Sequence, residues 1–240
     1  MKNVLFFSLI IFVFASGCSE ISGRRIKGSG NITSETRTVS GFRNIDVSGA
    51  IDVFIKQDSV TSVKVEADDN IQQYVQVHTQ GSALEIYTDR GLRLSTSRKI
   101  KVYVTNPAFD GFKISGASSV IGENEINSGD RISLHLSGAS EGRLDINAPK
   151  VLIDISGASS ANLRGRTKDL EANASGASKI RAYDLLSENA DVDVNGASHA
   201  DIYASVSLDG EASGASGVNY RGNASNSVRT SGASHVSKKD

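Results

Sequence analysis

The sequence predicts an all-β protein: a right-handed parallel β-solenoid of about 19-residue repeats with a bulkier N-terminal β cap. Three observations support this prediction. A tetrapeptide returns at nearly constant spacing, apolar residues alternate on both sides of it, and the composition combines 23 Gly with 2 Pro, 1 Met and no Trp. Self-similarity at a period near 20 residues is typical of repeat proteins whose small units stack on one another.

The repeated tetrapeptide is Ser-Gly-Ala-Ser, with Asn195 in place of the first serine in one copy and a looser copy at Ser48-Gly49-Ala50-Ile51. The intervals between its glycines are 22, 19, 19, 20, 18 and 18 residues. We interpret it as a structural corner, because stacked glycines leave no space for a larger side chain and serine hydroxyls bond to nearby backbone. The repeat-corner glycines are Gly116, Gly138, Gly157, Gly176, Gly196, Gly214 and Gly232.

Each corner is flanked by two predicted strands. Val151 and Ile155 precede Gly157 at alternating positions, and Ala161 and Leu163 follow it. Such alternation predicts half-buried strands. We expect the differences in repeat length to be absorbed in polar turns, since a one-residue slip would invert a strand. Inward positions of the later repeats are mostly alanine, so recognition is expected on the outer faces.

The N-terminus has the pattern of an export signal, predicted over residues 1–17. Lys2 precedes an apolar run over residues 4–14, and small residues follow. The run Ala-Ser-Gly-Cys that ends at Cys18, the single cysteine, resembles the bacterial lipobox and implies lipidation of Cys18. The alternative is an ordinary signal peptide with an incidental cysteine. Ser19 rather than Asp favours the outer membrane, with a periplasmic or a cell-surface orientation left open.

Three further segments are expected after the signal. Residues 18–38 are predicted to be a flexible lipid-anchored tether, because they are rich in Gly, Ser and Thr with almost no apolar periodicity. Residues 39–112 are expected to form the N-terminal β segment, and residues 113–237 the repeats. The net charge of −1 gives no indication of nucleic-acid binding.

The repeats and the segment before them together resemble a known family. The residues concerned are Phe42, Ile45, 47–49, 52–53, 63–67, 100–104, Pro107 and the repeated Ser-Gly-Ala-Ser down to Gly232. Over roughly residues 40–237 the chain resembles the family described as putative auto-transporter adhesin head GIN domain. The resemblance implies an exported β-helical domain and brings no catalytic residues with it.

One candidate ligand site follows from the repeat alignment. Outward positions three and five residues before the corner glycines carry an acidic stripe: Asp154, Glu171, Asp191, Asp193, Asp209 and Glu211. Like charges opposite one another destabilise a sheet, so a cation or a basic partner would relieve them. Ca²⁺ suits such oxygen ligands, and the alternative is a solvated face. No other cofactor is expected.

The four histidines, His78, His135, His199 and His235, do not predict a metal or acid-base site. His199 and His235 share one repeat position, but two repeats place them roughly 10 Å apart, too far for one ion.

We therefore expect a non-catalytic cell-envelope lipoprotein that acts as an adhesin-like binding or scaffold module. Its expected partners are the membrane, through the lipid anchor, and a glycan or protein on the outer faces, with Tyr183, Tyr203 and Tyr220 as candidates for sugar stacking. The alternative is a β-helical polysaccharide lyase or other carbohydrate-active enzyme. That reaction needs a basic residue on the acidic face, whereas Arg143 and Arg181 belong to the other strand. Self-association through the C-terminal edge is a further possibility.

Overall fold

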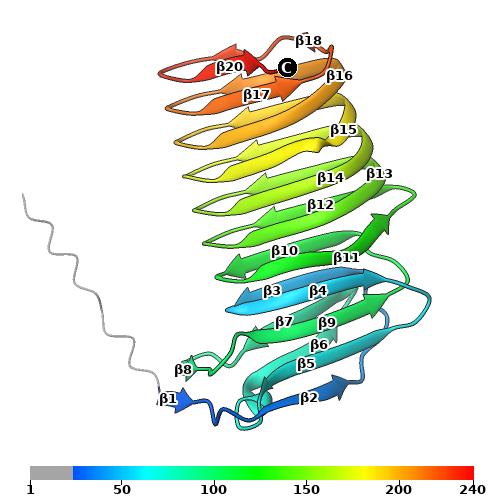
Figure 1. Ribbon diagram of the computed structural model, residues 1–240, viewed down its shortest axis with the longest axis vertical. Coiled ribbons are helices and arrows are strands. Elements are labelled where there is room, and N and C mark those ends of the chain that lie inside the picture. Colours follow the sequence, from blue (N-terminus) through cyan, green and yellow to red (C-terminus); the bar gives the residue numbers. More distant parts are fainter. Residues whose placement is uncertain (1–23) are drawn as a thin grey trace, which may run out of the picture.

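The computed structural model describes residues 24–240 and shows a β-solenoid (Figure 1). The predicted signal peptide, Cys18 and the start of the tether lie outside the described residues. Each turn is a flattened loop that is sharp at the Ser-Gly-Ala-Ser bend and rounded at the opposite side (Figure 1). We call the part of a turn after this bend the outgoing limb and the part before the next bend the returning limb.

The repeat strands pair in parallel with the corresponding strands of the neighbouring turns. From β13 to β16 one long strand forms both limbs of a turn. The strands are β10 (Gly111–Gly116), β11 (Ser119–Asn127), β12 (Arg131–Leu136), β13 (Glu141–Ile155), β14 (Ser160–Ala174), β15 (Lys179–Val194), β16 (His199–Ala212), β17 (Gly217–Arg221), β18 (Ser225–Asn226), β19 (Arg229–Thr230) and β20 (His235–Lys238).

The structure places every corner glycine in the left-handed region of backbone conformation, with φ between +71° and +80°. A Cβ on Gly176 would lie 2.7 Å from the carbonyl oxygen of Gly157 in the preceding turn. That oxygen accepts a hydrogen bond from the Ala177 N–H at 2.8 Å, and the same bond links successive corners. The final serine of the tetrapeptide is buried in every copy before the last, and Ser140 Oγ donates to the Ser137 carbonyl at 2.7 Å. The close approach of the backbones of successive turns is sufficient to explain the corner glycines, and no ligand is needed.

The N-terminal segment contains the first turn of the solenoid and a cap below it. β3 (Asn44–Gly49) and β4 (Ile51–Gln57) pair in parallel with β10 and β11, so the looser copy at Gly49 stacks under Gly116. β7 (Ala83–Thr88) and β9 (Ile100–Asn106) continue the stack beneath β3 and β4. The order of turns in space therefore departs from the order in sequence.

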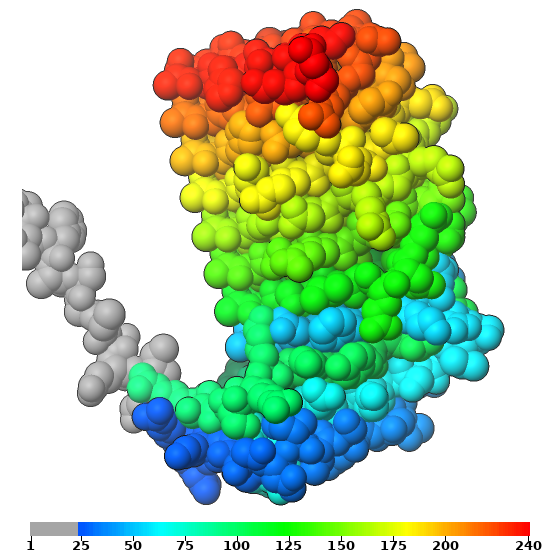
Figure 2. Space-filling model, in the orientation of Figure 1, coloured from blue at the N-terminus to red at the C-terminus, as the bar shows by residue number. Residues whose placement is uncertain are grey.

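Antiparallel strands close this end. β5 (Ser62–Asp68) pairs with β9, β6 (Val75–Gln80) pairs with β7, and a single 3₁₀ turn over Gln72–Tyr74 joins β5 to β6. The core here holds larger side chains, including Phe109 and Phe112 with ring centroids 5.7 Å apart, than the alanine-rich core of the later turns. Figure 2 shows the resulting surface: the colour bands follow the sequence from the green turns to the red C-terminal end, whereas blue, cyan and green alternate in the cap.

The flexible tether predicted for residues 18–38 is wrong over residues 24–37. β1 (Arg24–Lys27) pairs in parallel with β8 (Leu92–Ser95), and β2 (Ile32–Arg37) adds an antiparallel edge strand to β5. An edge strand exposed on one side needs few apolar residues, because backbone hydrogen bonds hold it to the sheet.

A buried carboxylate fastens the chain between these two strands. Asp68 is fully buried and accepts hydrogen bonds from the Gly30 N–H at 2.8 Å, the Ser97 N–H at 3.0 Å and the Ser97 hydroxyl. Burial opposes ionisation of Asp68, but the bonds from Ser97 and Gly30 outweigh it and lower its pKa.

Candidate functional site

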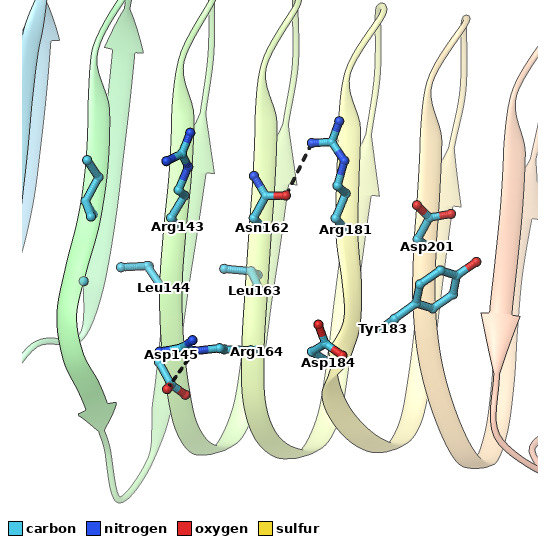
Figure 3. A pocket seen from close by; sticks show the side chains of 12 residues that line it. Arg143, Leu144, Asp145, Asn162, Leu163, Arg164, Arg181, Tyr183, Asp184 and Asp201 are labelled. Carbon is cyan, nitrogen blue, oxygen red and sulfur yellow. Dashed lines mark hydrogen bonds and ion pairs between the residues drawn. The ribbon is translucent and has the colours of Figure 1, made fainter.

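The candidate site is a groove of about 540 Å³ on the outgoing limbs of the middle turns (Figure 3). Strands β11 and β13–β16 contribute its walls and floor. The lining residues are Ile121, Gly122, Arg143, Leu144, Asp145, Asn162, Leu163, Arg164, Arg181, Tyr183, Asp184 and Asp201.

Parallel register aligns the polar residues of the groove in two columns. Arg143 pairs with Asn162, Asn162 with Arg181, and Arg181 with Asp201, so one side-chain position crosses four turns. These side chains point to the same face (Figure 3). The second column contains Asp145, Arg164 and Asp184, again aligned by register.

Hydrogen bonds fix the arginine heads in the groove. Arg181 Nη1 donates to Ser160 Oγ at 3.0 Å and to Asn162 Oδ1 at 3.4 Å. Arg164 Nε donates to Asp145 Oδ2 at 2.9 Å. Arg143 Nε is likewise held by a carboxylate, that of Glu141, at 2.8 Å. The groove thus presents paired donors and acceptors to a polar ligand.

Leu144 and Leu163 provide apolar surface at the bottom of the groove. Both occupy inward positions and are only 3% and 4% exposed. They lie between the two polar columns (Figure 3). A ligand with one apolar face and several hydroxyl or charged groups matches this combination of surfaces.

Tyr183 enters the groove because β15 bulges. Two residues of β15, Ala182 and Tyr183, stand opposite the single residue Leu163 of β14, and 183–185 have no partner in β16. The expectation that polar turns absorb every length difference is therefore wrong for this 20-residue repeat, whose additional residue lies within the strand. A bulge changes the direction of the side chains beside it, which explains the position of Tyr183.

The tyrosine is placed against two charged neighbours. Burial raises the pKa of the Tyr183 hydroxyl, and the charge of Asp201 and a hydrogen bond with that carboxylate raise it further. The guanidinium of Arg221 lies 4.4 Å from the ring centroid and opposes this increase. Tyr183 therefore stays neutral at physiological pH and presents a hydrogen-bonding hydroxyl beside an aromatic ring.

The predicted acidic stripe lies on the returning limbs. Glu171, Asp191 and Asp209 are aligned on neighbouring strands, as are Asp193 and Glu211, while Asn173 separates Asp154 from Asp193.

Several stripe residues have basic or hydroxyl partners. His135 Nδ1 lies 3.6 Å from Asp154, Lys150 Nζ 3.2 Å from Glu171, and Arg229 Nη2 2.8 Å from Glu211. The Ser227 hydroxyl donates to Asp209. Within residues 24–240, no three His, Cys, Asp or Glu side chains are placed to hold one metal ion. The Ca²⁺ site stays a prediction.

The histidine spacing departs from the sequence expectation. Although His199 and His235 are two turns apart, their ring centroids are only 6.3 Å from each other, because Gly217 stands between them without a side chain. The sequence-based argument that these two histidines are too far apart to share a site is therefore wrong. The other two histidines pair with carboxylates elsewhere, His78 with Glu85 at 3.0 Å and His135 with Asp154.

Sequence reasoning identified part of the groove. It assigned Arg143 and Arg181 to the strand that does not carry the acidic stripe, and it named Tyr183 as a candidate for sugar stacking. Nothing in the repeat showed that the three share a groove. Tyr220, also named as a candidate for sugar stacking, is only 9% exposed and belongs to the core. The one sign of the groove in the sequence is the interval of 20 residues between Gly176 and Gly196, one more than the interval before it. If this extra residue is placed within the strand rather than in a turn, it predicts the bulge.

The part of the chain from residue 24 onward contains no helix of the length and apolarity needed to span a bilayer. A search of curated proteins found no significant match.

Among solved structures, the chain is similar to a putative adhesin from Bacteroides fragilis, with a TM-score of 0.85, 20% identity, and coverage of 89% of this chain and 100% of that one. It is also similar to a putative adhesin from Parabacteroides merdae, with a TM-score of 0.70, 19% identity and coverage of 91% and 100%. A putative lipid binding protein from Parabacteroides distasonis matches with a TM-score of 0.69, 19% identity and coverage of 90% and 100%.

These likenesses establish the shared fold. The family model described as putative auto-transporter adhesin, head GIN domain, matches residues 41–224, within the stretch of roughly residues 40–237 over which the sequence resembles this family. The chain belongs to this family.

Proposed function

We propose that this protein is a non-catalytic, adhesin-like binding module of the cell envelope that holds a glycan along the groove on its outgoing limbs. The observation that carries the proposal is the conjunction of fixed guanidinium and carboxylate groups, the Tyr183 ring and an apolar floor in one groove. The family description and the adhesin names of similar structures support the binding role.

The charges of the groove favour a hydroxyl-rich ligand over a strongly charged one. Arg143, Arg164 and Arg181 are balanced by three aspartates that line the same surface. A sugar hydroxyl can accept a hydrogen bond from a guanidinium group and donate one to a neighbouring carboxylate. The columns run along the solenoid axis, so several sugar units of an extended chain fit better than one compact molecule.

Glycan-array binding, followed by calorimetry with the best oligosaccharide, tests the proposal. Arg181→Ala removes a positioned donor, and Tyr183→Ala removes the ring that the bulge directs into the groove. Each is expected to weaken binding at least tenfold. Arg229→Ala is the matched control, because Arg229 is exposed and paired with Glu211 on the returning limb. Equal affinity in all variants would place the ligand elsewhere.

The enzyme alternative has one structural argument against it and one direct test. The acidic stripe and the arginine column lie on different limbs, so the arrangement assumed for a lyase does not form. Asp145 and Asp201 do share the groove with Arg181, however. We expect purified protein to produce no absorbance from unsaturated products on uronate polymers, and a rise that Arg181→Ala abolishes would establish lyase activity instead.

Attachment to the membrane is proposed to occur through lipidated Cys18, on the resemblance of residues 15–18 to the lipobox. Protease treatment of intact cells, with wild type and Cys18→Ala compared, tests the anchor and its orientation together. An adhesin should be digested from outside, and Cys18→Ala should leave the membrane fraction. If digestion requires opening of the outer membrane, a periplasmic scaffold is the better function.

A further inference from the structure

We propose a second site beside the glycan groove, with ligands that the groove does not use: His199 and His235 bind a divalent transition cation such as Zn²⁺ across the space above Gly217. The three residues occupy one column, in register on β16, β17 and β20. In a regular ladder the middle side chain would separate the outer two. Here the middle residue has none.

Both imidazoles lie close to one point. A Cβ built on Gly217 would lie 2.8 Å from His199 Nδ1 and 3.0 Å from His235 Nε2. Two ring nitrogens thus lie within about 3 Å of a common position, whereas Zn²⁺ binds imidazole at about 2.0–2.1 Å. Small rotations of two surface side chains close the remaining distance of roughly 1 Å.

A carboxylate supports His199 from behind. His199 Nε2 lies 2.9 Å from Asp201 Oδ1, and the Asp201 side chain is only 14% exposed. Cation binding through Nδ1 requires the tautomer with the proton on Nε2. Asp201, a charged acceptor, favours that tautomer, whereas the Asn219 amide nitrogen beside the same atom opposes it. Metal-binding histidines are commonly oriented by a carboxylate on the second ring nitrogen in this way.

Asn219 adds an observation of a different kind. Its Nδ2 lies 2.8 Å from His199 Nε2 and donates to Asp201 Oδ1 at 3.1 Å. Within the described part of the chain, its Oδ1 is the buried side-chain atom that lacks a hydrogen-bond partner. Buried polar groups rarely stay unpaired, and a water bound to a nearby cation is a suitable donor for this oxygen.

The site supplies two protein ligands, since no third His, Cys, Asp or Glu among residues 24–240 converges with them. Solvent completes the coordination, so the cation remains open to exchange. A bound cation would connect β16 to β20 across β17. Among residues 24–240, β20 has paired residues in β17 alone, so binding is expected to stabilise the last turn by mass action.

The test is a calorimetric Zn²⁺ titration of the full chain without a histidine tag, repeated with Ca²⁺. We expect one Zn²⁺ per chain, no comparable Ca²⁺ signal at this site, and at least tenfold weaker Zn²⁺ binding for His199→Ala and His235→Ala. His135→Ala is the control, because this exposed histidine lies on the other limb beside Asp154, and its affinity should change less than twofold.

Gly217→Ala tests the geometry while both histidines remain. The backbone of Gly217 is outside the left-handed region, so alanine is tolerated there. Its Cβ would lie 2.6 Å from His235 Cε1 and must push the rings apart. We expect an unchanged circular dichroism spectrum with at least tenfold weaker Zn²⁺ binding. Absence of Zn²⁺ binding at millimolar concentration, or full affinity in both histidine variants, would overturn the proposal.

Discussion

Replacement of Gly176 by alanine tests the explanation given for the repeated corners. At φ +77° an L side chain costs about 1–2 kcal/mol relative to glycine. The new Cβ would also lie 2.7 Å from the Gly157 carbonyl oxygen, the acceptor of the Ala177 N–H. Overpacking of this kind costs about 1–3 kcal/mol. Gly176→Ala should therefore lower the free energy of unfolding by about 2–5 kcal/mol.

Gly91 offers a matched control for the backbone term alone. It has nearly the same φ, +78°, but nothing lies within 4 Å of its would-be Cβ. Gly91→Ala should cost only the conformational term of about 1–2 kcal/mol. Urea unfolding, followed by circular dichroism, measures both variants against wild type. If Gly176→Ala is no more destabilising than Gly91→Ala, backbone crowding between turns does not explain the glycine ladder.

Two further predictions concern carboxylates. The folded-state pKa of Asp68 is lowered, so its contribution to stability is present above the unfolded pKa of about 3.9 and is lost as pH falls through the folded value. Asp68→Asn should lower the free energy of unfolding at pH 7 but much less at pH 2, and equal losses at both pH values would contradict this assignment. For the acidic stripe, we expect millimolar Ca²⁺ to release heat and raise the melting temperature of wild type but not of Asp191→Asn; an unchanged wild type would refute the Ca²⁺ site.

The solenoid was predictable because its determinants are local and repeated. Each Ser-Gly-Ala-Ser bend needs a residue with φ near +75°, and the alternating residues beside it need one buried face. Neither requirement depends on distant parts of the chain, so a single sequence displays both many times. The first turn at Gly49 was detectable for the same reason, although sequence order gave no sign that β7 and β9 lie beneath it.

Residues 24–37 could not be assigned in the same way. β2 is held by backbone pairing to β5, and the chain before it by Asp68, which is distant in sequence and unremarkable in pattern. The groove was hidden by a similar limitation. Repeat spacing counts the extra residue between Gly176 and Gly196, but only strand register shows that it forms a bulge and places Tyr183 beside Asp201.

Departures from the repeat explain why chemistry gathers in the later turns. In a perfectly regular solenoid, the same type of side chain recurs on every turn. Here the bulge at Tyr183 adds one residue to a strand, and Gly217 leaves one position of a column without a side chain. Both changes bring unlike groups together around Asp201, which contacts Tyr183 on one side and His199 on the other. The two sites share that carboxylate but not their defining residues. Gly217→Ala should therefore weaken Zn²⁺ binding at least tenfold and leave glycan binding unchanged, while Tyr183→Ala should weaken glycan binding at least tenfold and leave Zn²⁺ binding unchanged.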